Sequence, residues 1–242
     1  MRSLAISISV VSALACSAVA QALPVLGQGT WETTLQARDL NGDSVTDAYY
    51  DTSLNITWLD DGSGNRPMTW SQANTWASNL VVGAYSDWRL PNITPSGSDL
   101  SGCLGQFNCN ESYNVDTSKS EMAHLFHVTL GNLSRFTPNG IQRGGNSGVD
   151  RGLVNTGPFG HLLAAFDWSG TAYAPAPSDF ALGFSTDVGG QFVLGQANGQ
   201  LSNYAMAVRP GDVTGIVPEP QSYALLLTGL AALAVVRRRR AT

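Results

Sequence analysis

The amino-acid sequence predicts an α+β domain in which two helices lie between strand-rich parts of the chain. Two segments, near residues 68–80 and 119–130, have apolar residues at helical spacing and begin with capping-box patterns. Short apolar runs separated by Gly, Pro, Asp and Asn precede and follow them, as in strands joined by turns. The 197 residues between the two ends, 21–217, suit one hydrophobic core, so we expect a single domain.

The first predicted elements are a β-hairpin and a helix. In "SVTDAYYDTSLNITWLDD", alternation indicates strands near 44–50 and 55–59 around a turn at 51–54. The helix follows in "MTWSQANTWASNL", where Thr69 and Gln72 have the spacing of a capping box. Its inward face is expected to contain Trp70, Ala73, Ala77 and Leu80.

The second helix is predicted over residues 119–130, with Ser118 and Glu121 as its capping box. Its inward face is expected to contain Met122, Leu125, Phe126 and Thr129. After a glycine-rich stretch that ends near Gly160, four runs have the character of strands. They are "LLAAFDWSGTAY", "DFALGFST", "GQFVLG" and "YAMAVRP".

The N-terminal residues 1–20 have the pattern of a secretory signal peptide. Arg2 precedes a long apolar stretch, and small residues stand at Ala18 and Ala20, so we expect signal peptidase to cleave after Ala20. A lipidated Cys16 is the alternative interpretation.

The C-terminal residues combine a short apolar run with a cluster of arginines. Residues 223–236 contain no charge, and as a helix at ~1.5 Å per residue they would reach only about 21 Å. A settled transmembrane helix has roughly 20 residues, although a shorter one holds where flanking arginines snorkel. The positive-inside rule then keeps Arg237, Arg238, Arg239 and Arg240 in the cytoplasm and the rest of the chain outside it.

Pro218, Glu219 and Pro220 stand ahead of this apolar run. The order of the three parts resembles the PEP-CTERM sorting signal of Gram-negative envelope and matrix proteins. The resemblance implies that residues 213–242 form a sorting tail, which the membrane protease exosortase recognises and cleaves near residues 218–220. The ectodomain would then reach the cell surface, the outer envelope or the extracellular matrix; a plain C-terminal membrane anchor is the alternative.

The body of the protein is acidic. Residues 21–217 carry eight basic and seventeen acidic residues, a formal net charge of −9, and Lys119 is the one lysine in the chain. This charge argues against diffuse electrostatic binding of nucleic acid or of acidic polysaccharide.

Two cysteines, Cys103 and Cys109, lie in the loop-like stretch "SGCLGQFNCNES". In an oxidising compartment they are expected to form one disulfide that closes a small loop. A two-cysteine metal site is the alternative, but the spacing matches no common zinc pattern.

Calcium is the one cofactor that the sequence suggests. In "RDLNGDSVTD", the side chains of Asp39, Asn41, Asp43 and Asp47 and the carbonyl of Val45 occur at alternate positions, as in loops that close around calcium. Ser44 stands where such loops prefer glycine, and Tyr50 takes the place of the closing glutamate. A polar turn leading into the hairpin is the alternative interpretation.

No catalytic residues are predicted, and we expect a protein that is not an enzyme. The sequence contains no Gly-x-Ser-x-Gly elbow, no free cysteine in the mature body and no glycine loop that would hold a phosphate. Glu121, His124 and His127 do not have the spacing of a zinc protease, so a structural role is expected for both histidines.

The body resembles the Lcl C-terminal domain family, from about Val45 to Pro210. The matching words, in the family's order, are "TDAYYDTSLNITWL", "MTWSQANTWASNL", "YSDWRLPN", "SEMAHLF", "FDWSGTAY" and "YAMAVRPG". The resemblance implies a domain over residues 44–212, after a lead at 21–43, with a C-type lectin-like fold. In that fold two helices flank a small, mainly antiparallel sheet with long loops.

Within these words, Trp88 and Arg89 invite two interpretations, because aromatic rings and arginines bind ligands but also build cores. We favour the structural one, in which Trp88 and Leu90 fill the core, a carboxylate pairs with Arg89, and Trp168 and Arg209 play similar parts.

The predicted function is that of an exported binding module of the cell envelope or matrix. The resemblance favours a carbohydrate or a surface polymer as its ligand, bound by the loops near residues 92–118 and 135–161. A purely structural matrix protein and, less favoured, a hydrolase of surface polymers are the alternatives.

Overall fold

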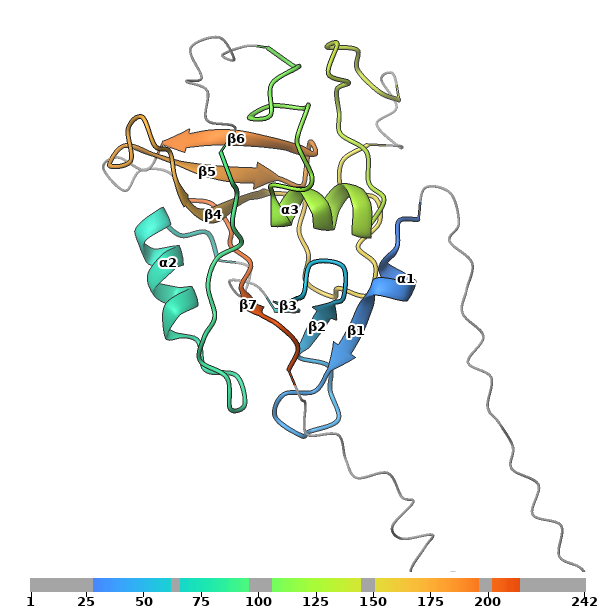
Figure 1. The fold of residues 1–242 in the computed structure, drawn as a ribbon, viewed down its shortest axis with the longest axis vertical. Helices are drawn as coiled ribbons and strands as arrows, with labels where there is room; N and C mark the ends of the chain where they lie inside the picture. Colours follow the sequence, from blue (N-terminus) through green and yellow to red (C-terminus); the bar gives the residue numbers. More distant parts are fainter. Residues whose placement is uncertain (1–27, 62–65, 96–105, 145–150, 196–201, 214–242) are drawn as a thin grey trace, which may run out of the picture.

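The computed structural model describes residues 28–61, 66–95, 106–144, 151–195 and 202–213. They form two small antiparallel sheets, with order β1-β2-β3-β7 and β4-β5-β6, and a few short helices. Figure 1 shows helix α3 between the two sheets and helix α2 beside them. This arrangement agrees with the predicted α+β class, but the strands form two sheets where one was expected.

The predicted hairpin is present, with shorter strands than expected. Strand β2 (Ala48–Asp51) pairs with β3 (Ile56–Leu59), so that Ala48 faces Leu59 and Asp51 faces Ile56. Residues 44–47 do not extend the first strand, because the carboxylates nearby accept backbone N–H groups and hold this segment in a loop.

The first sheet begins within the segment that was predicted as a lead. Helix α1 (Trp31–Thr34) runs directly into strand β1 (Leu35–Arg38), which pairs with β2 along its whole length. On the other side, β7 (Val208–Pro210) pairs with β3. The two ends of the described chain therefore lie in the same sheet.

Helix α2 (Trp70–Asn79) confirms the first capping box. The Thr69 hydroxyl accepts the N–H of Gln72, and the Gln72 side chain accepts the N–H of Thr69. Ala73 and Ala77 are buried on the inward face, while Trp70 donates its indole N–H to the Ser169 carbonyl at 2.7 Å. The helix is thereby fixed to strand β4.

The prediction of the second capping box, between Ser118 and Glu121, is wrong. Helix α3 (Glu121–His124) begins after Ser120, whose hydroxyl accepts the N–H of Ala123, and it continues as the π-helix η2 (Leu125–Thr129). Ser118 instead donates its N–H and its hydroxyl to Asp116. The reason is that the Glu121 carboxylate is engaged elsewhere, in a pair with Arg89.

The four strand-like runs of the last third are confirmed. Strands β4 (Phe166–Ala172), β5 (Phe180–Ser185) and β6 (Gly190–Gly195) form the second sheet, with a bulge in β4 between Trp168 and Ala172. The fourth run contributes β7 to the first sheet. Tyr204, just before β7, forms a parallel bridge to Asp167, and this bridge connects the two sheets.

The core consists of three clusters of buried side chains. The largest joins Trp58 of β3, Phe126 of η2 and Phe184 of β5, so it fills the space between the two sheets. Trp88 and Trp168 belong to the two other clusters, against which α2 packs. Burying a side chain of this size contributes roughly 1.5–3 kcal/mol, so each of these aromatic residues stabilises the fold substantially.

Within the described ranges, no helix has the length and apolar character needed to cross a membrane. The predicted signal peptide (1–20), the transmembrane helix (223–236) and the arginine cluster lie outside these ranges.

Candidate functional site

A pocket of about 460 Å³ lies where the loop before β2, the end of β3 and helix α2 meet. Its volume is in the range of small-molecule sites. The residues that line it are Val45, Thr46, Asp47, Leu59, Asp60, Asp61, Arg66, Trp76, Leu80, Val82 and His161. Four segments that are distant in sequence therefore contribute to one hollow.

Asp60 joins two walls of this pocket. Its backbone N–H donates to the Asp47 carbonyl at 2.9 Å, which fixes the end of β3 against the loop before β2. Its carboxylate accepts the N–H of Gly160 at 3.0 Å, and the other carboxylate oxygen lies 3.6 Å from Nδ1 of His161. The Asp60 side chain thus holds residues 160–161 at the pocket.

Helix α2 supplies the apolar wall. Trp76 is half-buried and packs against two of the core clusters, and Leu80 follows it one turn later. Val82 exchanges backbone hydrogen bonds with Tyr85, which closes a tight turn after the helix. An indole held in this way presents a rigid surface to a ligand.

The pocket has an excess of negative charge. Asp47, Asp60 and Asp61 line it together with a single guanidinium, that of Arg66, and with His161. In the part of the chain that the structure describes, neither Asp61 nor Arg66 forms an ion pair. These two side chains are therefore the charges that a ligand can engage without breaking an existing pair.

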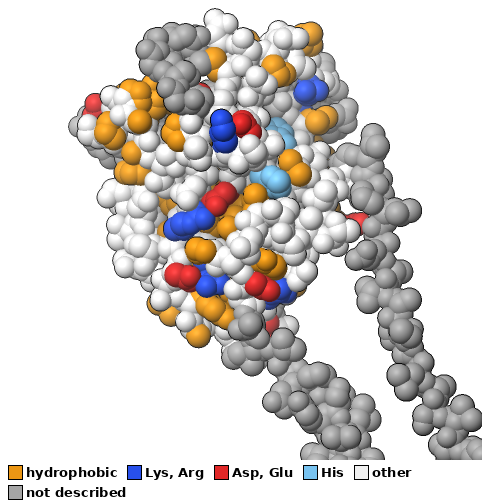
Figure 2. All heavy atoms as spheres, viewed as in Figure 1, with side chains coloured by type: hydrophobic (Ala, Val, Ile, Leu, Met, Phe, Trp, Pro, Cys, Tyr) orange, Lys and Arg blue, Asp and Glu red, His pale blue; other side chains and the backbone are white. Residues whose placement is uncertain are grey.

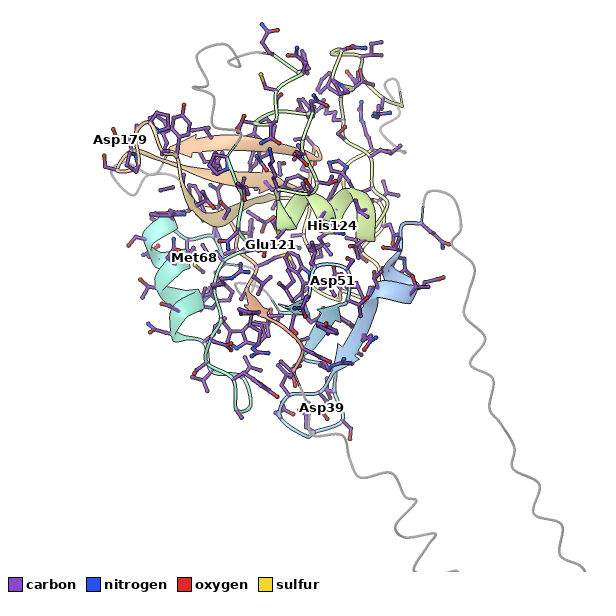
Figure 3. All side chains as sticks on the ribbon, viewed as in Figure 1. Asp39, Asp51, Met68, Glu121, His124 and Asp179 are labelled. Carbon is purple, nitrogen blue, oxygen red and sulfur yellow. The ribbon has the colours of Figure 1, made fainter. Side chains whose placement is uncertain are left out.

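The predicted calcium loop forms part of the same region, because Val45 and Asp47 belong to both. It joins β1 to β2, and Figure 3 shows Asp39 in this loop, at one end of the molecule. The Asp39 carboxylate accepts the N–H groups of Gly42 and Ser44, at 2.7 and 2.8 Å. Desolvation raises the pKa of Asp39, but backbone N–H donors, that of Ser44 first, outweigh it and hold the pKa below its ordinary value.

The oxygen atoms of the loop are occupied by its own hydrogen bonds. The Asn41 amide group donates to Asp43 at 3.1 Å and to Asp47 at 3.4 Å, and Asp43 accepts the N–H of Val45 at 2.8 Å. Ser44 has a φ of 70°, the conformation for which such loops prefer glycine. Among the described residues, no group of three or more His, Cys, Asp or Glu side chains is placed to hold a metal, so calcium binding stays a prediction.

The structural interpretation of "DWRLP" is confirmed for its apolar residues. Trp88 is 3% and Leu90 2% exposed, and both lie in the core. Arg89 forms two hydrogen bonds of 2.8 Å with Glu121, which also accepts the N–H of Asn92. These residues do not form a strand, since Arg89 makes only an isolated bridge, to Val208.

Arg209 is likewise a structural residue. It forms a two-hydrogen-bond pair with Asp87, at 2.7 and 3.0 Å, and lies over the ring of Tyr85. Arg38 pairs with Asp212 in the same manner. Figure 2 shows basic side chains next to acidic ones on this face, which is otherwise largely uncharged.

The histidines have separate partners. His124 lies 3.1 Å from the Ser53 hydroxyl, which donates to the buried carboxylate of Asp51. His127 contacts the Asn132 carbonyl at 3.1 Å, and burial lowers its pKa. Since Glu121 is paired with Arg89, these residues do not form a metal-binding face.

The loops that were expected to bind a ligand contain an aromatic cluster. Phe107 and Tyr113 from one loop pack against Phe136 from the other, with ring centroids 4.9 to 5.6 Å apart. Their rings are half-buried by one another, so the cluster holds the two loops together. Cys109, in the first loop, is in a disulfide, but Cys103 lies outside the described residues, and the pairing of the two stays a prediction.

Comparison with known proteins identifies the C-terminal tail. Residues 217–240 match the PEP-CTERM protein-sorting motif. The protein is therefore an exported one, whose tail is recognised by exosortase and processed at the envelope. No curated protein and no solved structure matches the chain.

The pocket was not predicted from the sequence. Its acidic residues come from two segments, and only Asp47 had been selected, as a calcium ligand. The adjacent pair Asp60 and Asp61, directly after a buried strand, is the signal that could have indicated it, because strand ends are frequent sites of ligand contact.

Proposed function

We propose that this protein is an exported binding module of the envelope or extracellular matrix, and that it recognises a carbohydrate in the pocket beside α2. The observation that carries the proposal is the combination of the Trp76 indole with Asp47, Asp60, Asp61 and Arg66 in one hollow. The resemblance of the body to the Lcl C-terminal domain, and through it to C-type lectin-like folds, supports the same function.

The chemistry of the pocket suits a sugar. A pyranose ring has an apolar face of C–H groups, which packs on an aromatic ring, and a rim of hydroxyls, which donate to carboxylates. The pocket offers both kinds of surface, from different elements: the indole comes from α2, and Asp60 and Asp61 directly follow β3. Few convergent polar groups on a mainly apolar wall are typical of small-molecule sites.

The sorting tail explains how such a module reaches its ligand. We propose cleavage by signal peptidase after Ala20, temporary anchoring by residues 223–236, and exosortase cleavage near residues 218–220. Outside the cytoplasm Cys103 and Cys109 would pair, because that compartment is oxidising. The proposed product is a non-enzymatic domain at the surface of a Gram-negative cell.

The test is a glycan array with the purified chain, followed by titration of the best ligands in the presence and absence of calcium. Trp76→Ala should weaken binding by at least about tenfold, since it removes the stacking surface. Asp61→Asn should keep the fold, because Asp61 is exposed, and should weaken binding of the same ligands. Phe180→Ala removes an aromatic ring that is 40% exposed and does not line the pocket, so its binding should be unchanged.

Two results would oppose the proposal in different ways. If no glycan binds, a structural matrix protein becomes the better interpretation. If glycans bind but Trp76→Ala and Asp61→Asn bind them as well as the wild type, the site lies elsewhere, and the loops with the aromatic cluster become the next candidate. Release of shorter products during the titration would reveal a hydrolase.

A further inference from the structure

The side chains that line the pocket carry more negative than positive charge. Three carboxylates line it against one guanidinium, and His161 adds a positive charge only when it is protonated. The body as a whole has eight basic and seventeen acidic residues, so its long-range field points the same way as the pocket. A sulfated or uronic acid polymer would meet repulsion from both.

We propose that the ligand is an amino sugar with a free ammonium group, or a polymer that contains such sugars. The inference rests on the proposed carbohydrate-binding function and narrows it to one chemical class.

Asp61 is the residue that we assign to the ammonium group. It is exposed and forms no ion pair among the described residues, so it gives up no existing partner when it binds a cation. Asp60, the next residue, has one oxygen engaged by the Gly160 N–H, while the other faces the His161 ring at 3.6 Å. A cation near these two carboxylates is attracted by both of them, because ammonium and carboxylate groups form charge-assisted hydrogen bonds.

Asp47 adds to the field without serving as a direct partner. One of its oxygens accepts the Leu40 N–H at 2.7 Å, and the other accepts the Asn41 amide group at 3.4 Å. Both atoms are thus used in holding the loop, although the negative charge remains beside the pocket. This arrangement gives a fixed negative potential in addition to the free carboxylate of Asp61.

Arg66 is the group that could reverse the preference. It is exposed and forms no ion pair among the described residues, so it can bind a carboxylate or a sulfate. A single guanidinium against three carboxylates leaves the site negative, and we expect Arg66 to bind a neutral hydroxyl or to stay in solvent. Arg66→Gln should therefore leave binding of a cationic sugar unchanged or strengthen it.

The experiment compares three probes of equal length on the purified chain: glucosamine oligomers, N-acetylglucosamine oligomers and heparin-derived sulfated oligomers. Near neutral pH and about 50 mM salt, the free amines should bind at least about tenfold more tightly than the acetylated oligomers, and the difference should shrink at about 0.5 M salt. The sulfated probe should bind most weakly.

Two matched variants test whether Asp61 causes the preference for the free amine. Asp61→Asn should reduce the preference for the free amine several-fold, because it should weaken binding of the free amine more than binding of the acetylated oligomer. Asp179→Asn is the control, because it makes the same change at an exposed position on the turn before β5, far from the loop with Asp39 (Figure 3). It should keep the full preference.

The outcomes separate this inference from the proposed function. If acetylated oligomers bind equally well or better, or if Asp61→Asn and Asp179→Asn behave alike, the charge assignment is wrong while carbohydrate binding stands. Tightest binding of the sulfated probe overturns the assignment as well. If none of the three probes binds and the glycan array is also negative, both ideas fail.

Discussion

The buried carboxyl group of Asp167 should make the stability of this protein depend on pH in an unusual direction. Asp167 lies in β4, is 5% exposed, and its Oδ2 has no hydrogen-bond partner among the residues that the structure describes. Burial raises its pKa from 3.8 to about 7. Since most carboxylates of folded proteins have pKa values near or below those of the unfolded chain, this group opposes the usual trend.

The sign and the size follow from proton linkage. Between pH 3.8 and about 7 the folded protein keeps a proton on Asp167 that the unfolded chain loses, so the free energy of unfolding falls as the pH rises. The slope is about 1.4 kcal/mol per pH unit, which gives a loss of about 4 kcal/mol over the whole window. Below this window the group is protonated in both states, and above it the loss is complete.

Asp167→Asn removes this dependence with almost no change in shape, because an amide resembles the protonated carboxyl group. Chemical denaturation of both proteins from about pH 5 to pH 8 gives the difference in free energy of unfolding. That difference should grow by roughly 2–3 kcal/mol in favour of Asn between pH 5 and pH 7 and then stay constant.

The difference in free energy of unfolding between the two proteins is the quantity to compare, because other groups also change the stability of both proteins with pH. Burial lowers the pKa of His127, so its contribution to stability increases as the pH rises towards 6.5, which opposes the effect of Asp167. The lowered pKa values of Asp87 and Asp212, which come first from their arginine partners, affect stability only in more acidic solution. A difference that stays flat from pH 5 to pH 8 would refute the assignment of a neutral, buried Asp167.

Three further predictions concern the loop and the Arg89 pair. Ser44→Gly should raise the free energy of unfolding by about 0.5–1 kcal/mol, because Ser44 has a φ of 70°, whereas Gly42→Ala, at a φ of 82°, should lower it by about 1 kcal/mol in the same denaturation assay. Glu121→Ala should cost about 2 kcal/mol, since it leaves Arg89 and the Asn92 N–H without their acceptor, while Lys119→Ala, in an exposed pair, should change stability by less than about 0.5 kcal/mol. If the loop binds calcium, a calcium concentration about 100 times Kd should raise Tm by about 5–10 °C for the wild type and not for Asp39→Ala; equal responses would show that the loop is only a turn.

Local sequence signals predicted the elements that depend on neighbouring residues. The capping box of Thr69 and Gln72 is a contact over three residues, and the hairpin of β2 and β3 is set by one turn, so each can be read from a short window. The strand runs of the last third were likewise visible, because their apolar residues are separated by turn residues.

Long-range contacts decided the features that the sequence did not predict. Glu121 has the spacing of a capping residue for Ser118, yet it pairs with Arg89, which is 32 positions away in the chain. The Glu121 carboxylate accepts from Arg89 and from the Asn92 N–H, and α3 begins after Ser120 instead. Strand β1 was missed for a similar reason: its residues have little apolar alternation, and their pairing with β2 holds them. The pocket was not predicted for the same reason, because its lining residues come from four segments that are separated in the sequence.

The last described residues before the sorting tail are held firmly in the fold. Val213 is buried in the core, and Asp212 pairs with Arg38 of β1, so the first sheet is closed immediately before the sorting motif begins at residue 217. At the other end, the described fold starts at residue 28, after the proposed cleavage site at Ala20. The proposed exosortase cleavage near residues 218–220 would therefore leave in place the contacts described for the sheet, and the pocket lies among the residues that would be kept. Removal of the tail should change the location of the protein and leave its Tm and its affinity for ligand as they were.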